Sequence, residues 1–68
     1  MMMMNSTTSQ EGYDAIMRGL HQSEYSHQEI EETRLAAEQA LAEVGGEAPA
    51  SSFWAIYKTI KKQLRAER

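Results

Sequence analysis

The chain has 68 residues, enough for one domain, and a domain of this size buries only about 60% of its unfolded surface. It contains no cysteine, which excludes disulfides and thiolate metal ligands as a source of stability. Small chains without such crosslinks usually gain stability by oligomerising or by folding against a partner. The length and composition therefore favour a binding role.

The N-terminal residues indicate neither a membrane span nor a secretion signal. No apolar run approaches the ~18–20 residues that cross a bilayer, and the basic and apolar regions of a signal peptide are missing. We therefore expect a cytoplasmic protein. Residues 1–10 lack periodicity and predict a disordered tail, in which the four leading methionines are either native or a start-site artefact.

The net charge of −3 conceals two oppositely charged parts. Residues 1–48 carry nine acidic and two basic side chains, a net charge of −7, whereas residues 49–68 carry five basic and one acidic, a net charge of +4. Such asymmetry indicates either neutralisation between helices or an electrostatic interaction surface.

Residues 11–68 are expected to form one helical domain with helices over about 11–22, 27–44 and 52–66. The first helix is predicted by apolar residues that recur every three or four positions. These residues are Tyr13, Ile16, Met17 and Leu20.

The second helix has the clearest boundaries. Ser26 and Glu29 form a capping-box pattern at its start, Tyr25 and Ile30 are spaced as a hydrophobic staple, and glycines 45 and 46 predict its end. One apolar stripe is expected on Ile30, Ala37, Leu41 and Val44, with Thr33 and Ala40 beside it. Leu35 lies outside this stripe, among glutamates, and is either an incidental exposed residue or part of an interface.

The third helix, capped by Ser51 or Ser52, concentrates the aromatic and basic residues. Its apolar stripe consists of Phe53, Ile56, Tyr57, Ile60 and Leu64. Three amphipathic helices joined by short connectors predict an all-α, three-helix domain, and we expect a dimer.

No enzymatic motif occurs in the chain, so we expect no catalysis, no cofactor and no metal site. The two histidines, His21 and His27, have only scattered carboxylates such as Glu24 near them, fewer than the ligands that a zinc site needs. Glycines 45 and 46 end a helix and do not form a phosphate loop.

Beside the apolar stripe of the third helix, Lys58, Lys61, Lys62 and Arg65 form a basic arc with Trp54 at its margin. Three interpretations of the arc are open. Its cations complement the negative C-terminal end of the helix dipole, bind an acidic protein surface, or neutralise the phosphates of a nucleic acid. Since the whole domain is acidic, with a sequence pI near 5.2, nucleic acid is the weaker alternative. Trp54 is either a core residue or a partly exposed binding anchor.

The segments YSHQEIEETRLAAEQALAEV and PASSFWAIYKTI resemble the C-terminal half of the Hha and YmoA nucleoid-modulating proteins. Glu38 falls where that family carries an acidic residue, but the family's second helix has no counterpart here. The three-helix layout is also similar to the small YmgB-type biofilm and acid-response regulators of bacteria. The resemblance implies helix-mediated dimerisation and control of gene expression without catalysis.

Our interpretation is a small regulatory adaptor that binds a protein partner, forms a homodimer and acts in transcription regulation. The expected partner-binding residues are Trp54, Lys58, Lys61, Lys62, Arg65, Leu35 and Glu38. One alternative is a DNA-binding regulator that uses the last helix. Another is an antitoxin- or phage-type inhibitor, whose acidic surface would consist of Glu29, Glu31, Glu32, Glu38 and Glu43.

Overall fold

The structure, a computed structural model, describes residues 7–22 and 24–67. Its helices are α1 (Ser9–Gln22), α2 (His27–Val44) and α3 (Ala50–Ala66), and no strand occurs among the described residues. The prediction of an all-α, three-helix fold is confirmed. The bounds of α2 are those expected from the sequence, whereas α1 and α3 each begin two residues earlier.

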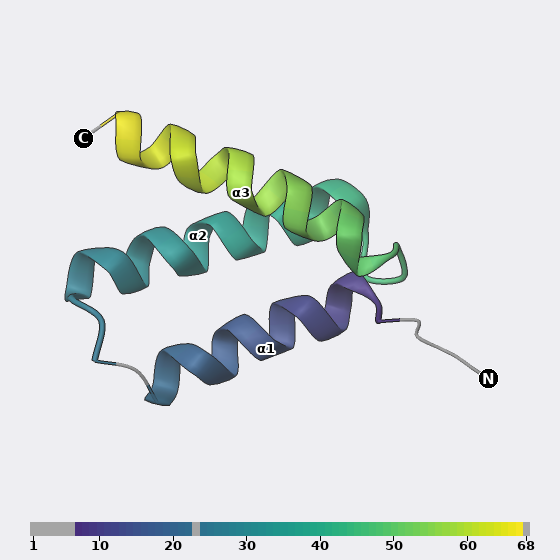
Figure 1. Ribbon diagram of the computed structural model, residues 1–68, viewed down its shortest axis with the longest axis horizontal. Helices are drawn as coiled ribbons and strands as arrows, with labels where there is room; N and C mark the ends of the chain where they lie inside the picture. The colour runs from purple at the N-terminus through teal and green to yellow at the C-terminus, as the bar shows by residue number, and fades with distance from the viewer. Residues whose placement is uncertain (1–6, 23, 68) are drawn as a thin grey trace.

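The middle helix lies between the other two (Figure 1). Successive helices run in opposite directions, so the first turns of α1 and α3 meet beside the connector that joins α2 to α3 (Figure 1). From there α1 and α3 diverge toward their C-terminal ends. Contact between these two helices is therefore concentrated at one end of the molecule.

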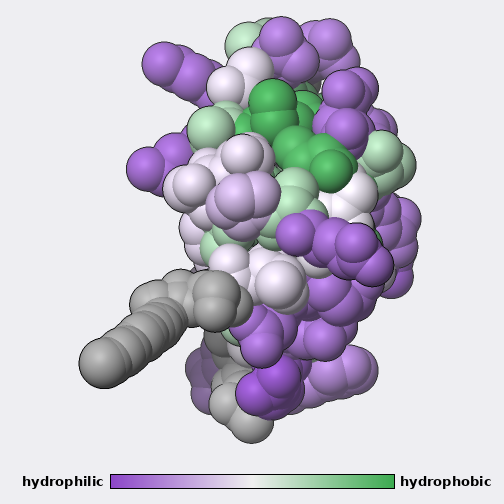
Figure 2. Space-filling view, turned by 90° about the vertical axis from the view of Figure 1, so that its right-hand side faces the viewer, coloured by the Kyte–Doolittle hydropathy of each residue, from purple (hydrophilic) through white to green (hydrophobic). Residues whose placement is uncertain are grey.

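The core is built on small residues of α2 and one aromatic residue of α3. Ala36, Ala37 and Ala40 have no exposed surface, and Phe53 is also fully buried. Because alanine side chains are short, both neighbouring helices can pack close to the α2 backbone. The partly buried side chains around this centre are Tyr13, Ile16, Met17, Leu41, Val44, Ile56, Tyr57 and Ile60. Figure 2 shows an apolar patch on the end of the molecule near the connector, with hydrophilic side chains on one side of it and side chains of intermediate hydropathy on the other.

The buried face of α2 is wider than the predicted stripe. Glu32 and Ala36 are buried as well as Thr33, whereas Ile30 is only partly buried. The physical reason is that α2 has a neighbour on two sides, so residues on both flanks are covered. The apolar pattern predicted one flank of this face and missed the flank that carries Glu32 and Ala36.

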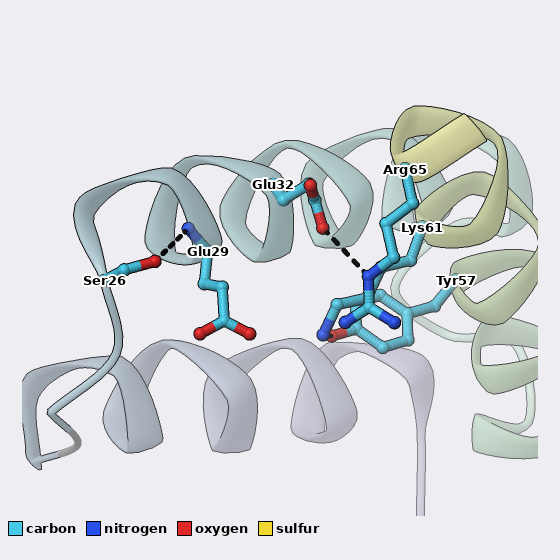
Figure 3. Close-up of polar contacts among 6 residues, drawn as sticks. All are labelled: Ser26, Glu29, Glu32, Tyr57, Lys61 and Arg65. Carbon is cyan, nitrogen blue, oxygen red and sulfur yellow. Dashed lines mark hydrogen bonds and ion pairs between the residues drawn. The ribbon is translucent and has the colours of Figure 1, made fainter. Parts of the chain in front are cut away.

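Both ends of α2 are set by local interactions. The Ser26 Oγ accepts the backbone N–H of Glu29 at 3.2 Å, as predicted. The reciprocal bond, from the Ser26 backbone N–H to the Glu29 carboxylate, is not formed, and in Figure 3 this carboxylate points away from Ser26. At the other end, Gly45 has a φ of 86°, which favours glycine, and its N–H donates to the Leu41 carbonyl at 2.8 Å.

Residues 7–10 are hydrogen-bonded to the connector between α2 and α3, an interaction that we call the clasp. The backbone N–H groups of Ser9 and Gln10 donate to the carbonyls of Ala48 at 2.8 Å and Gly46 at 3.0 Å, and the Ala50 N–H donates to the Thr7 carbonyl at 3.0 Å. The Ser9 side chain is fully buried. The predicted disordered tail over residues 1–10 is therefore wrong for residues 7–10, while residues 1–6 lie outside the described residues.

A capping box that the sequence prediction missed starts α1. The Thr8 N–H donates to the Glu11 carboxylate at 3.0 Å, and the Glu11 N–H donates to the Thr8 hydroxyl at 3.3 Å. The two residues have the same spacing as Ser26 and Glu29. The signal was present in the sequence.

The predicted cap of α3 is wrong. The helix begins at Ala50 after Pro49, and no side chain caps it. The carbonyl of Thr7 accepts the Ala50 N–H, so one of the free donors at this helix start is satisfied by the clasp. Ser51 and Ser52 thus lie inside the helix, where both are exposed.

Candidate protein-binding edge of α3

One face of α3 carries Trp54, Lys58, Lys61 and Arg65, with Lys62 beside it. Their spacing of three or four residues places successive members one above the other on a helix. We call these five residues the basic edge. It flanks the buried side of the helix, which is centred on Phe53.

Trp54 is both a packing residue and a surface residue. It is 36% exposed, and its ring contacts the rings of Phe53 and Tyr57 edge-on, at centroid distances of 5.1 and 5.6 Å. Phe53 and Tyr57 stack on each other at 5.9 Å. Core neighbours therefore hold the indole in place while part of it remains exposed, a combination that is typical of binding hot spots.

Lys61 is oriented by Tyr57, four residues earlier in the same helix. Its Nζ donates to the Tyr57 hydroxyl at 3.2 Å and lies 5.4 Å from the centre of the ring. Both side chains are partly buried. The ammonium group is thus held against an aromatic face, a favourable position for a cation.

Arg65 joins the end of α3 to α2. Its Nε donates to the buried carboxylate of Glu32 at 3.3 Å, as Figure 3 shows. The Arg65 side chain is 55% exposed, whereas that of Glu32 is 6% exposed. This ion pair is the internal neutralisation that the charge asymmetry indicated, and it gives Arg65 a structural role besides any contact with a partner.

The basic side chains line one shallow depression of about 430 Å³ together with Tyr57. Lys58 and Lys62 are exposed and form no ion pair with any described residue. The depression therefore keeps a net positive charge even after the Arg65–Glu32 pair is counted. A positively charged surface of this kind attracts carboxylates or phosphates.

Leu35 and Glu38 do not line this depression. Leu35 is 42% exposed and lines a second depression with Leu64, so more than half of the side chain is covered where α2 meets α3. Glu38 is exposed on α2. The seven predicted binding residues thus fall into one group on the basic edge and a separate pair on α2.

The sequence interpretation assigned Tyr57 to the apolar stripe and missed its part in the basic depression. The signal was the four-residue spacing between Tyr57 and Lys61, which brings a phenol and an ammonium group together on a helix. His21 and His27 are exposed. Over the part of the chain that the structure describes, no cluster of three acidic or histidine side chains could hold a metal, and no helix is both long and apolar enough to cross a bilayer.

The chain matches no family model, no curated protein and no solved structure.

Proposed function

We propose that the protein is a small, non-catalytic regulatory adaptor that binds an acidic partner protein through the basic edge of α3. One observation carries the proposal. The indole of Trp54 is fixed by the rings of Phe53 and Tyr57 but partly exposed, and the lysines beside it form no ion pair with a described residue. Trp54 offers apolar area, and Lys58 and Lys62 offer charges that no described carboxylate neutralises. A partner that presents an apolar side chain flanked by carboxylates would match both features.

A protein partner is favoured over nucleic acid because the positive surface is narrow. The chain as a whole has a net charge of −3, and α2 exposes Glu29, Glu31, Glu38 and Glu43. A phosphate backbone that extends past the basic edge would meet these carboxylates. A compact acidic site on a protein would not.

The adaptor is proposed to act as a homodimer. The apolar residues Leu35 and Leu64 line a common depression where α2 meets α3, and a second copy would cover it. A domain of this size also gains stability from such an association. The proposed role in gene expression depends on the resemblance to the Hha, YmoA and YmgB groups of regulators.

Quantitative affinity capture from the native organism tests the adaptor function. Tagged wild-type protein is compared with Trp54→Ala and with a Lys58→Glu/Lys62→Glu variant, and Ser52→Ala, an exposed change in the same helix, is the matched control. We expect one acidic protein to be recovered by the wild type and the control and to be lost with both edge variants. The proposal would be contradicted if all four tagged proteins recovered the same partner equally, or if the wild type recovered no partner protein.

The second candidate is a DNA-binding regulator, which the grouping of four cations around one depression favours. An electrophoretic mobility shift with duplex DNA at low salt tests it. This candidate requires a shift that weakens as salt rises and that Lys61→Ala/Lys62→Ala removes. No shift at low salt excludes it and leaves the protein partner as the proposal.

A further inference from the structure

The two glycines within α1 lie in opposite surroundings. A methyl group at Gly12 would lie 3.1 Å from the Cδ2 of Phe53, because α1 and α3 pack directly against each other there. At Gly19, about 10 Å further along the helix, a methyl group would meet no described atom within 4 Å. The two helices diverge between these positions (Figure 1). A side chain at the first position would therefore crowd Phe53, whereas one at the second would not.

A cavity of about 230 Å³ lies where the helices have diverged. All three helices and the connector between α1 and α2 contribute to its lining, which includes Ile16, Leu20, Tyr25, Thr33, Tyr57 and Lys61. Gly19 is part of the same wall. Its missing side chain thus adds to the open space, at a cost to helix stability of about 1 kcal/mol relative to alanine.

The lining combines aliphatic side chains and neutral polar groups with one cationic group. Ile16 and Leu20 contribute aliphatic surface from α1, while Lys61 is the only charged side chain among the described lining residues. The Lys61 Nζ already donates to the Tyr57 hydroxyl at 3.2 Å. An ammonium group has three donors, so it can also donate to a bound acceptor.

We propose that this cavity binds a small amphipathic carboxylate. The carboxylate would accept a hydrogen bond from Lys61, and the apolar part of the ligand would lie against Ile16 and Leu20. Because the volume is below the ~300–1,000 Å³ typical of pockets for drug-sized molecules, the ligand is a short acyl or aryl acid. Binding at this site does not depend on the partner proposed above.

Octanoate is a suitable probe, and the fluorescence of Trp54 is a suitable signal because its ring lies 5.6 Å from that of Tyr57. We expect a saturable fluorescence change with octanoate and much weaker changes with acetate, which has no apolar chain, and with octanol, which has no charge. Lys61→Met keeps an apolar stem and removes the charge, and it should weaken octanoate binding about tenfold or more. Gly19→Leu should abolish binding by filling the space, with the helical circular dichroism retained.

Isotope-filtered NMR on the wild-type protein locates the probe without relying on a variant. We expect cross-peaks from the octanoate chain to the methyl groups of Ile16 and Leu20. Cross-peaks confined to Leu35 and Leu64 would overturn the proposal, as would the absence of saturable binding. The proposal would also be overturned if octanol bound as tightly as octanoate. The same holds if a folded Gly19→Leu protein bound octanoate as tightly as the wild type does.

Discussion

Replacing each glycine of α1 by alanine should change stability in opposite directions. Alanine is favoured over glycine inside a helix by about 1 kcal/mol because it restricts the unfolded chain more. At Gly19 no described atom opposes the added methyl group, so Gly19→Ala should stabilise the fold by about 0.5–1 kcal/mol. The same helix propensity acts at Gly12.

At Gly12 the packing outweighs the propensity. The new Cβ would lie 3.1 and 3.3 Å from two ring carbons of Phe53 and 3.5 Å from the Trp54 ring. Phe53 is fully buried and stacked on Tyr57, so it cannot move aside without displacing a second ring. Overpacking of this kind costs about 1–3 kcal/mol, and the net effect of Gly12→Ala should be a loss of about 0–2 kcal/mol.

Thermal unfolding followed by circular dichroism measures the contrast directly. In a domain of 60–100 residues, 1 kcal/mol shifts Tm by about 4–8 °C. A difference of about 0.5–3 kcal/mol between the two variants should therefore separate their Tm values by roughly 2–24 °C. Both are compared at one protein concentration, because self-association would make Tm depend on it. If Gly12→Ala raised Tm as much as Gly19→Ala does, the close contact between α1 and Phe53 would be refuted.

Four further substitutions, one of them a control, test the packing and the helix ends. Ser26→Ala removes the N-cap of α2 and should lower the free energy of unfolding in urea by about 0.5–2 kcal/mol. Ser52→Ala should change it by no more than about 0.5 kcal/mol, because Ser52 caps no helix. Equal losses in the two variants would contradict the observed start of α3. Thr8→Ala removes the hydroxyl that accepts the Glu11 N–H and should speed hydrogen exchange at the Glu11 amide. Unchanged exchange at Glu11 would contradict the capping box of α1. Phe53→Ala should cost about 3–5 kcal/mol, enough to remove a cooperative thermal transition; a Tm near that of the wild type would contradict its place in the core.

The elements that the sequence predicted well are those fixed by neighbouring residues. The boundaries of α2 follow from Ser26 at one end and from a positive φ at Gly45 at the other, and both interactions lie within a few residues. The stripe centred on Phe53 is likewise set by helical periodicity. Local chemistry of this kind can be read from a sequence.

The elements that were missed depend on contacts between distant segments. Thr7 and Ser9 are held by the connector about forty residues later, and the same contact replaces the serine cap expected for α3. The cavity near Gly19 arises from the angle between α1 and α3, which no local pattern specifies. For the candidate site, the sequence identified Trp54 and the lysines, but their relation to Tyr57 required the structure.

The central claim is that the basic edge of α3 contacts an acidic protein. Photo-crosslinking in the native organism tests it most directly, with a photoreactive residue placed at Lys58 on the edge or at Ser52, which is exposed elsewhere on the same helix. We expect an adduct with an acidic protein from position 58 and none from position 52. Equal adducts from both positions, or adducts at position 58 with nucleic acid alone, would contradict it.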